Sequence, residues 1–439
     1  MAERLSRRQG LGLIGGGLCA ASLPARAASA DPARFMTGAA LYDHVRTYTG
    51  LGEHRTGTPG DLATADWIAE VFSRAGLETE KQPVPFRYWE LGECFLEVGG
   101  TRFRTDPEFF PLGTSPEGIT APLRMLTDGE PLEALAGSIW LVETTRVSMV
   151  VPRALREQAV EAGRKGALGV VIIVASWTGD LLGRGAIPPA GDTDWQSVPI
   201  VGAAPKDGDV LKAAAASGTP VRLVSTGRDV PNHTAYNVIG RWQGTREPER
   251  LVIVTTPQSG MFRCGGERGG GIAQCLGLAE WVAARRPGIS YLFSTNTGHE
   301  QKGRGAGRLH QEIVPPPEKV EAWLHLGSGI GSYDWRAAAD GSLERHVGSP
   351  GAIRNFGAVP SLVPLLTKAF DHIPGLVPQS ERFEGELGYY VGEGYPGFGF
   401  WGANAFHHTL ADGPEQTGPE LQEPIGLALR KALLAIEAG

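Results

Sequence analysis

The chain has 439 residues, of which 41% are hydrophobic and 20% are charged, and its formal net charge is −7. This length exceeds what a single hydrophobic core usually serves, so we expect a globular protein with more than one domain. The acidic balance argues against nucleic acid or an anionic membrane surface as a partner.

The first 30 residues are similar to a signal peptide. Residues 6–11, Ser-Arg-Arg-Gln-Gly-Leu, resemble a twin-arginine export motif, and a weakly apolar, glycine-rich stretch follows as far as Leu23. Residues 25–27 (Ala-Arg-Ala) or 28–30 (Ala-Ser-Ala) suit a signal peptidase. The alternative is a chance arginine pair in an unstructured tail. We predict export to the periplasm or the exterior, and no later stretch is long and apolar enough to span a bilayer.

Residues 31–115 are predicted to form the first part of a main α/β domain. Helical spacing of apolar residues predicts one helix over Ala40–Tyr48 and a second over Leu62–Ala75. Asp61 is the expected N-terminal cap of the second helix, because a short polar side chain accepts from the free amides there. Gly76 is expected to end that helix, and a strand follows.

The pattern changes between residues 116 and 230. Short apolar strands and helices alternate there: Ile139–Val142, Ala154–Gly163, Val170–Val174, Val198–Val201 and Asp207–Ala216. This order resembles the protease-associated domain, a small β-rich insert common in secreted peptidases. The resemblance implies a role in substrate access or protein contact. An unrelated α/β subdomain is the alternative.

Residues 231–439 are predicted to form the main part of the α/β domain, with a mostly parallel sheet flanked by helices. Its predicted elements alternate along the chain: strands Leu251–Val254, Tyr291–Ser294 and Ala322–Gly327, with helices Gly271–Ala284, Pro360–Phe370 and Gly418–Glu437. Side chains able to bind metals or move protons follow these strands. The ends of adjacent parallel strands are where α/β proteins usually bind ligands.

From His54 onward the sequence resembles the secreted di-zinc aminopeptidases, which include bacterial leucyl aminopeptidases and glutamate carboxypeptidase. That family has a His-x-Asp strand end, a bridging Asp-Asn-x-x-Gly-x-Ala segment and a Glu-Glu-x-Gly-x-x-Gly segment. An Asp-Met strand end and a His-Thr-x-x-Asp loop complete its site. The resemblance implies a zinc aminopeptidase-like fold and hydrolysis of an amide bond.

The match to these motifs is uneven. Glu267, in the run Glu-Arg-Gly-Gly-Gly-Ile-Ala, replaces the bridging aspartate, and Glu300 keeps the second glutamate of its pair. His299 stands at the position of the family's catalytic base. Residues 408–412, His-Thr-Leu-Ala-Asp, match the last loop closely, and His325 falls near the Asp-Met position. The His-x-Asp pair has no counterpart, because residues 255–259 read Thr-Thr-Pro-Gln-Ser.

The resemblance therefore implies one metal site or none. Glu267, Glu300 and His408 are the predicted ligands, with His325 as a possible fourth and Asp412 as the residue that orients His408. Two carboxylates with one or two imidazoles suit one divalent metal, zinc before manganese or iron. His407 is interpreted as a neighbour of the site. His325 has the alternative of a hydrogen-bonded core residue.

Three residues have competing interpretations. His299 is either a proton shuttle, because imidazole exchanges protons near neutral pH, or a packing residue at a strand end. Glu267 and Arg268 could instead form a structural ion pair beside the glycine-rich turn. Cys264 is a candidate thiolate ligand or a nucleophile activated by His299. It is otherwise an inert thiol or a disulfide partner of Cys275, with Cys94 as the third cysteine after the signal.

We predict an exported hydrolase of the aminopeptidase or carboxypeptidase type that cleaves an amide bond in a peptide or related small molecule at a single-metal site. Two alternatives stay open. One is a catalytically inactive homologue that binds a peptide or envelope partner. The other is a thiol hydrolase that uses Cys264 with His299.

Overall fold

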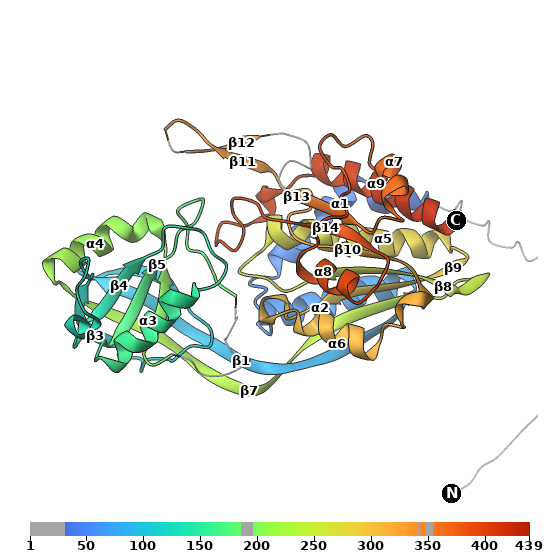
Figure 1. Cartoon of the computed structure of the whole chain (residues 1–439). Coiled ribbons are helices and arrows are strands. Elements are labelled where there is room, and N and C mark those ends of the chain that lie inside the picture. Colours follow the sequence, from blue (N-terminus) through green and yellow to red (C-terminus); the bar gives the residue numbers. More distant parts are fainter. Residues whose placement is uncertain (1–30, 186–195, 341, 347–353) are drawn as a thin grey trace, which may run out of the picture. The chain divides into compact units, whose positions relative to one another are not determined.

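The computed structural model describes residues 31–185, 196–340, 342–346 and 354–439 (Figure 1). The predicted signal peptide lies outside the described residues. The strands are β1 (Glu78–Val98), β2 (Thr101–Pro107), β3 (Ile119–Arg124), β4 (Ile139–Glu143), β5 (Gly169–Ile173), β6 (Ile200–Ala203), β7 (Pro220–Trp242), β8 (Glu247–Pro257), β9 (Ile289–Asn296), β10 (Val320–Leu326), β11 (Asp334–Ala337), β12 (Leu343–His346), β13 (Arg354–Ala358) and β14 (Gly397–Gly402). The α-helices are α1 (Gly38–Gly50), α2 (Pro59–Ala75), α3 (Arg153–Arg164), α4 (Gly208–Ser217), α5 (Gly270–Arg285), α6 (Arg304–Glu312), α7 (Val363–Ala369), α8 (Gly385–Gly392) and α9 (Pro419–Ala438).

Twelve strands form one mixed sheet in the order β1-β2-β6-β5-β4-β3-β7-β9-β8-β10-β14-β13. In its later part β9, β8, β10 and β14 are parallel neighbours. The antiparallel strands β7 and β13 border this group on its two sides. The predicted α/β class, a mostly parallel sheet flanked by helices, is confirmed for this part of the chain.

Successive side chains of these strands point to opposite faces, and both faces are covered by helices. On β8, Val252 and Val254 pack in the core with α1, α2, α5 and α9, whereas Ile253 packs with residues of α6 and α8. On β10, Leu324 and Trp323 divide between the same two cores. The period of two along a strand explains why a run of uninterrupted apolar residues is needed when both faces are buried.

Residues 116–230 contain four short strands, β3 to β6, which are parallel to one another, with helices α3 and α4. These elements have cores of their own, one on each face of the strands. The strands β1 and β7 pair antiparallel over most of their length (Figure 1). Because β7 continues across residue 230 without a break, the predicted boundary there falls inside a strand. The assignment of this segment as a protease-associated domain stays a prediction.

The predicted capping role of Asp61 is wrong. Helix α2 begins at Pro59, and the hydroxyl of Thr58 accepts from the amide of Asp61. Proline is favoured in the first turn because its missing N–H has no helical partner there. The buried Asp61 carboxylate instead accepts from Gly57, Gln258 and Thr297. It thereby joins the start of α2 to the ends of β8 and β9.

In the described part of the chain, no helix combines the length and the apolar character needed to cross a membrane. Most of the predicted site residues lie in the segments that follow the carboxyl ends of β8, β9 and β14, and His325 lies near the carboxyl end of β10. This is the edge of the parallel strands at which the sequence places them.

Candidate functional site

A glycine-rich helical turn, Gly265–Gly269, follows β8 and carries Glu267 into the interior. A Cβ atom at Gly265 would lie 2.0 Å from the carbonyl oxygen of Gly413, so only glycine allows this close backbone approach. Asp412 accepts from the amides of Gly266 at 2.7 Å and Glu267 at 3.0 Å. The sequence predicts Asp412 as the residue that orients His408, but its carboxylate instead fixes the turn that carries Glu267.

Glu267, His407 and His408 form a buried cluster whose candidate ligand atoms all lie within 4.8 Å of one another. The Nε2 atoms of His408 and His407 are 3.3 and 3.7 Å from the same oxygen, Oε1 of Glu267. The two imidazole rings are stacked, with centroids 4.6 Å apart. One carboxylate and two imidazoles are the protein ligands of many catalytic zinc sites.

His408 is oriented by the segment between residues 116 and 230. Its Nδ1 lies 3.1 Å from the carbonyl oxygen of Gly183, and the amide of Gly183 donates to the carbonyl of His408 at 2.8 Å. The next residues, Leu182 and Thr409, form an antiparallel bridge. These contacts hold His408 at a φ of +60°, a conformation that costs a non-glycine residue energy. If Nδ1 carries the proton toward Gly183, Nε2 is left with a lone pair directed at the cluster.

Burial lowers and the Glu267 carboxylate raises the pKa of both histidines, but the net shift differs between them. Burial lowers the pKa of His407 to about 3, which favours a neutral ring. Burial also acts to lower the pKa of His408, but the Glu267 carboxylate outweighs it and the pKa of His408 is raised.

Glu300 is engaged by Arg268. Nη2 of Arg268 lies 2.7 Å from Oε1 of Glu300 and 2.9 Å from Oε1 of Glu267, and all three side chains are buried. Nε of Arg268 donates to the carbonyl of Ser259 at 3.0 Å, and the Ser259 hydroxyl donates to Oε2 of Glu300 at 3.3 Å. The structure therefore joins Glu300 to Glu267 through the Arg268 guanidinium, while the compact ligand cluster consists of Glu267 with His407 and His408.

His299 lies in the loop after β9 and pairs with a carboxylate. Its Nδ1 is 2.8 Å from Oε1 of Glu386, a buried residue of α8. Asn296 donates to the other oxygen of Glu386 at 3.2 Å. Burial acts to raise the pKa of Glu386, but the His299 hydrogen bond and charge outweigh it and the pKa is lowered. The amide of His299 donates to the Ser259 hydroxyl, which links this pair to Glu300.

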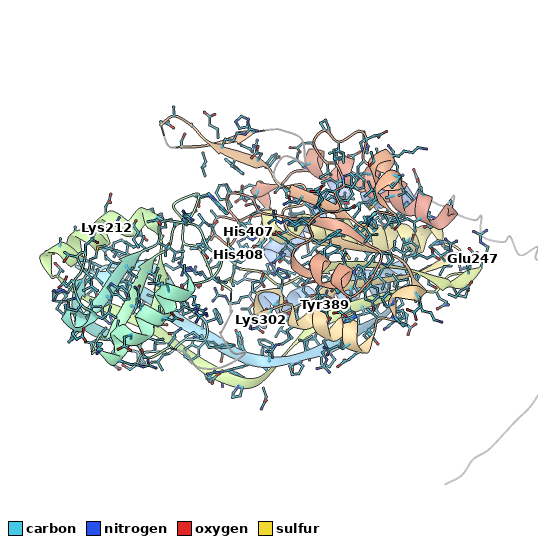
Figure 2. All side chains as sticks on the ribbon, in the orientation of Figure 1. Lys212, Glu247, Lys302, Tyr389, His407 and His408 are labelled. Atoms are coloured by element: carbon cyan, nitrogen blue, oxygen red, sulfur yellow. The ribbon has the colours of Figure 1, made fainter. Side chains whose placement is uncertain are left out.

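The His299–Glu386 pair borders a pocket of about 360 Å³. Lys302 and Tyr389 also line it (Figure 2), together with small residues at the start of α6 and α8. His299 is the most exposed member of the pair, with 28% of its side chain accessible. A ligand in this pocket therefore meets the histidine ring before it meets Glu386.

His325 is satisfied within the sheet. Its Nδ1 lies 3.0 Å from the hydroxyl of Thr255, and burial lowers its pKa to about 4. It is not a member of the cluster around Glu267. Its surroundings correspond to the alternative of a hydrogen-bonded core residue.

Cys264 is fully buried, and its thiol donates to the carbonyl of Met261. Burial, and next the charge of Glu267, raises the pKa of this thiol well above its usual value. Cys94, Cys264 and Cys275 are all free, so the suggested disulfide between Cys264 and Cys275 is absent. A protonated, inaccessible thiol is a poor nucleophile.

We expect Cys264→Ser to leave metal content unchanged and to change hydrolytic activity less than about threefold, because a buried neutral thiol takes no part in proton or acyl transfer. The folded wild-type protein should also resist iodoacetamide at Cys264. Peptide mapping by mass spectrometry measures this, with the half-buried Cys94 as an internal comparison. Loss of activity in the serine variant with metal retained would instead support a thiol mechanism.

Three residues of this site, His407, Glu386 and Arg268, show little of their role in the sequence. In the sequence, His407 is simply the residue before His408 and belongs to no motif. Only the stacking of its ring on that of His408 distinguishes it. Glu386 follows no motif, and its helix α8 is short and glycine-rich. The sequence indicates an ion pair between Arg268 and Glu267. It does not indicate the second partner of Arg268, Glu300, which is 32 residues away.

Comparisons with known proteins identify the fold. No model of a protein family matches the sequence, and no curated protein is similar to it. A zinc aminopeptidase from Bacillus subtilis superposes with a TM-score of 0.69 at 16% identity, over 91% of this chain and 95% of that one. A peptidase M28 precursor from Shewanella amazonensis SB2B gives 0.67 at 16% identity, over 93% and 95%. An aminopeptidase from Aneurinibacillus sp. strain AM-1 gives 0.60 at 18% identity, over 92% and 95%. The chain has the fold of the zinc aminopeptidases.

Proposed function

We propose that this protein is a metal-dependent hydrolase of the aminopeptidase type, with one divalent metal, zinc, held by Glu267, His407 and His408. The observation that carries the proposal is the convergence of two imidazole Nε2 atoms on one buried carboxylate oxygen. This proposed ligand set differs from the one that the sequence predicts. Glu300 is paired with Arg268, and His407 is the third proposed ligand instead.

The residues of this cluster fit a metal ion. Oε2 of Glu267 is buried and accepts no hydrogen bond from the described residues, whereas Oε1 lies 2.9 Å from Nη2 of Arg268; Nδ1 of His407 also lacks a partner in the described part of the chain. Burying such groups without partners is costly. His408, in contrast, has its Nδ1 against a backbone carbonyl, as metal-binding histidines usually do. A cation on Glu267, His407 and His408 would provide a partner for the Glu267 carboxylate where the described residues leave Oε2 without one.

A bound zinc ion would supply a Lewis acid and would acidify a water molecule to a pKa of about 7. The chain's own residues would move the protons. With Nδ1 of His299 held by Glu386, its Nε2 is free to accept a proton at the pocket and to return it to the leaving amine. Glu386 holds the ring in one orientation through its contact with Nδ1. Ser259 and Glu300 connect this pair to the metal cluster.

The proposed substrate is a peptide or a related small amide, and the pocket of about 360 Å³ beside His299 is large enough to hold part of such a ligand. We also propose export through the twin-arginine signal in residues 1–30. The segment 116–230 is proposed to be a protease-associated insert, and its contact with His408 gives it a direct influence on the metal ligand.

Replacing Glu386 with glutamine should lower kcat by about 100-fold while KM and metal content stay within about twofold of wild type, because the lost contact orients His299 and leaves the metal cluster intact. Steady-state kinetics on a cleavable peptide measure the two constants separately. Glu386→Asp, which keeps the carboxylate, should recover part of kcat. A rise in KM as large as the expected fall in kcat, with kcat itself unchanged, would assign Glu386 to substrate binding instead.

The position of Arg268 favours a second candidate function. Its guanidinium already neutralises Glu267 and Glu300, as expected in a protein that has replaced metal chemistry with a structural ion pair. Such a protein would bind a peptide or an envelope partner in the pocket without cleaving it. Metal analysis separates the two candidates.

The proposed function is tested directly by incubating the purified full chain, loaded with one equivalent of zinc, with a defined peptide mixture and with aminoacyl p-nitroanilides. Mass spectrometry should detect removal of terminal residues. Dipicolinate should abolish the reaction, and added zinc should restore it. Binding of zinc with no cleavage of any member of the mixture would refute the hydrolase and leave the binding protein.

A further inference from the structure

Arg268 occupies an unusual position for an arginine. A single nitrogen, Nη2, approaches Glu267 at 2.9 Å and Glu300 at 2.7 Å, so it lies in the gap between two carboxylates. The Arg268 side chain is only 2% exposed, and Nε is anchored to the Ser259 carbonyl. The guanidinium is therefore held at Nε by the Ser259 carbonyl and at Nη2 by the two carboxylates.

The charges of this group require a cation at that point. Two buried carboxylates without a partner would be costly, because removing a charge from water is repaid only by a close opposite charge. Arginine is suited to the position because its guanidinium stays charged and donates in fixed directions. A divalent ion bound to oxygens of both glutamates would lie in the same gap, since metal–oxygen bonds are about 2.0–2.2 Å long.

We propose that Arg268 is a built-in cation that takes the place of a divalent metal between Glu267 and Glu300, and that its removal opens a metal site on these two carboxylates. Glu267 is 0% exposed, and its Oε2 has no hydrogen-bond partner among the described residues, which is a second sign that this carboxylate is available to a further cation. This cation position lies between Glu267 and Glu300 and shares Oε1 of Glu267 with the site proposed at His407 and His408. The two positions are told apart by the number of ions bound, which is measured without a hydrolysis assay. The inference therefore stands or falls independently of hydrolysis.

The test is the number of divalent ions bound by wild type and by Arg268→Ala, measured by equilibrium dialysis against zinc or manganese followed by elemental analysis. Arg268→Ala should bind one more equivalent than wild type. Arg268→Lys, which keeps a positive charge, should bind the same number as wild type. In the double variant Arg268→Ala with Glu300→Gln, the additional equivalent should disappear. An unchanged count in Arg268→Ala would overturn the proposal.

Folding is monitored in parallel by circular dichroism with and without metal. Arg268→Ala should unfold at a lower temperature than wild type in chelator and should recover most of the difference in zinc, because binding to the folded state alone stabilises it. If Arg268→Ala folds in neither condition while Arg268→Lys folds, the proposal is also overturned. A count of zero in wild type and one in Arg268→Ala would sustain this inference and refute the proposed function. One in both would do the reverse.

Discussion

His408→Ala is expected to lower zinc affinity by at least about 100-fold and to abolish metal-dependent hydrolysis. The variant removes one of two imidazole ligands, and loss of outer contacts to metal ligands alone already costs about 10–100-fold in affinity. The backbone contacts of residue 408 with Gly183 do not involve the ring and should persist. Isothermal titration calorimetry of metal-free protein with zinc measures the affinity.

The matched control is His372→Ala. This histidine is largely on the surface, where its Nε2 contacts the carbonyl of Pro424, and it takes no part in the cluster. Its variant should bind zinc as wild type does. Unchanged zinc affinity in His408→Ala, with a native circular dichroism spectrum, would remove His408 from the ligand set and with it the proposed site.

His299→Ala should have a different signature, a fall in kcat of roughly 10²–10⁴-fold with zinc stoichiometry unchanged. This is the usual contribution of a positioned general acid–base group. Its Nδ1 is committed to Glu386, so the alanine variant loses the ring that faces the pocket and leaves the carboxylate in place. Steady-state kinetics together with elemental analysis on the same samples separate the two effects.

The His299→Ala variant also distinguishes proton transfer from a purely structural role and from metal binding. A merely structural histidine would lower the unfolding temperature and leave kcat of the folded fraction nearly unchanged. Full activity in a folded, zinc-loaded His299→Ala protein would show that another group moves the proton. Loss of zinc in this variant would place His299 among the metal ligands instead.

Much of the fold could be predicted because both faces of the central strands are buried. The run Leu251–Val254 must be apolar throughout when alternate residues enter two different cores, and the strand there is confirmed. The helices predicted near residues 40–48 and 62–75 are also confirmed as α1 and α2. Helix α8 escaped prediction because three glycines in eight residues give it little helical pattern.

The site was harder to predict because its contacts join residues that are distant along the chain. The sequence predicted Glu267, Glu300 and His408 as ligands at one strand edge; the structure places His408 3.3 Å from Glu267, whereas Glu300 is joined to Glu267 by Arg268. It could not reveal that Arg268 would lie between the two glutamates, because an arginine beside a glutamate is usually a surface pair. Nor could it reveal that Gly183, from a separate segment, would orient His408. Both depend on the geometry of the whole fold.

The central claim is that one metal ion binds at Glu267, His407 and His408. Elemental analysis of the full chain, dialysed against micromolar zinc and then against metal-free buffer, tests it most directly when wild type and a His407→Ala/His408→Ala variant are compared. We predict about one equivalent of zinc in wild type and less than about one-tenth in the double variant. Less than one-tenth of an equivalent in wild type, or equal zinc in both proteins, would contradict the account.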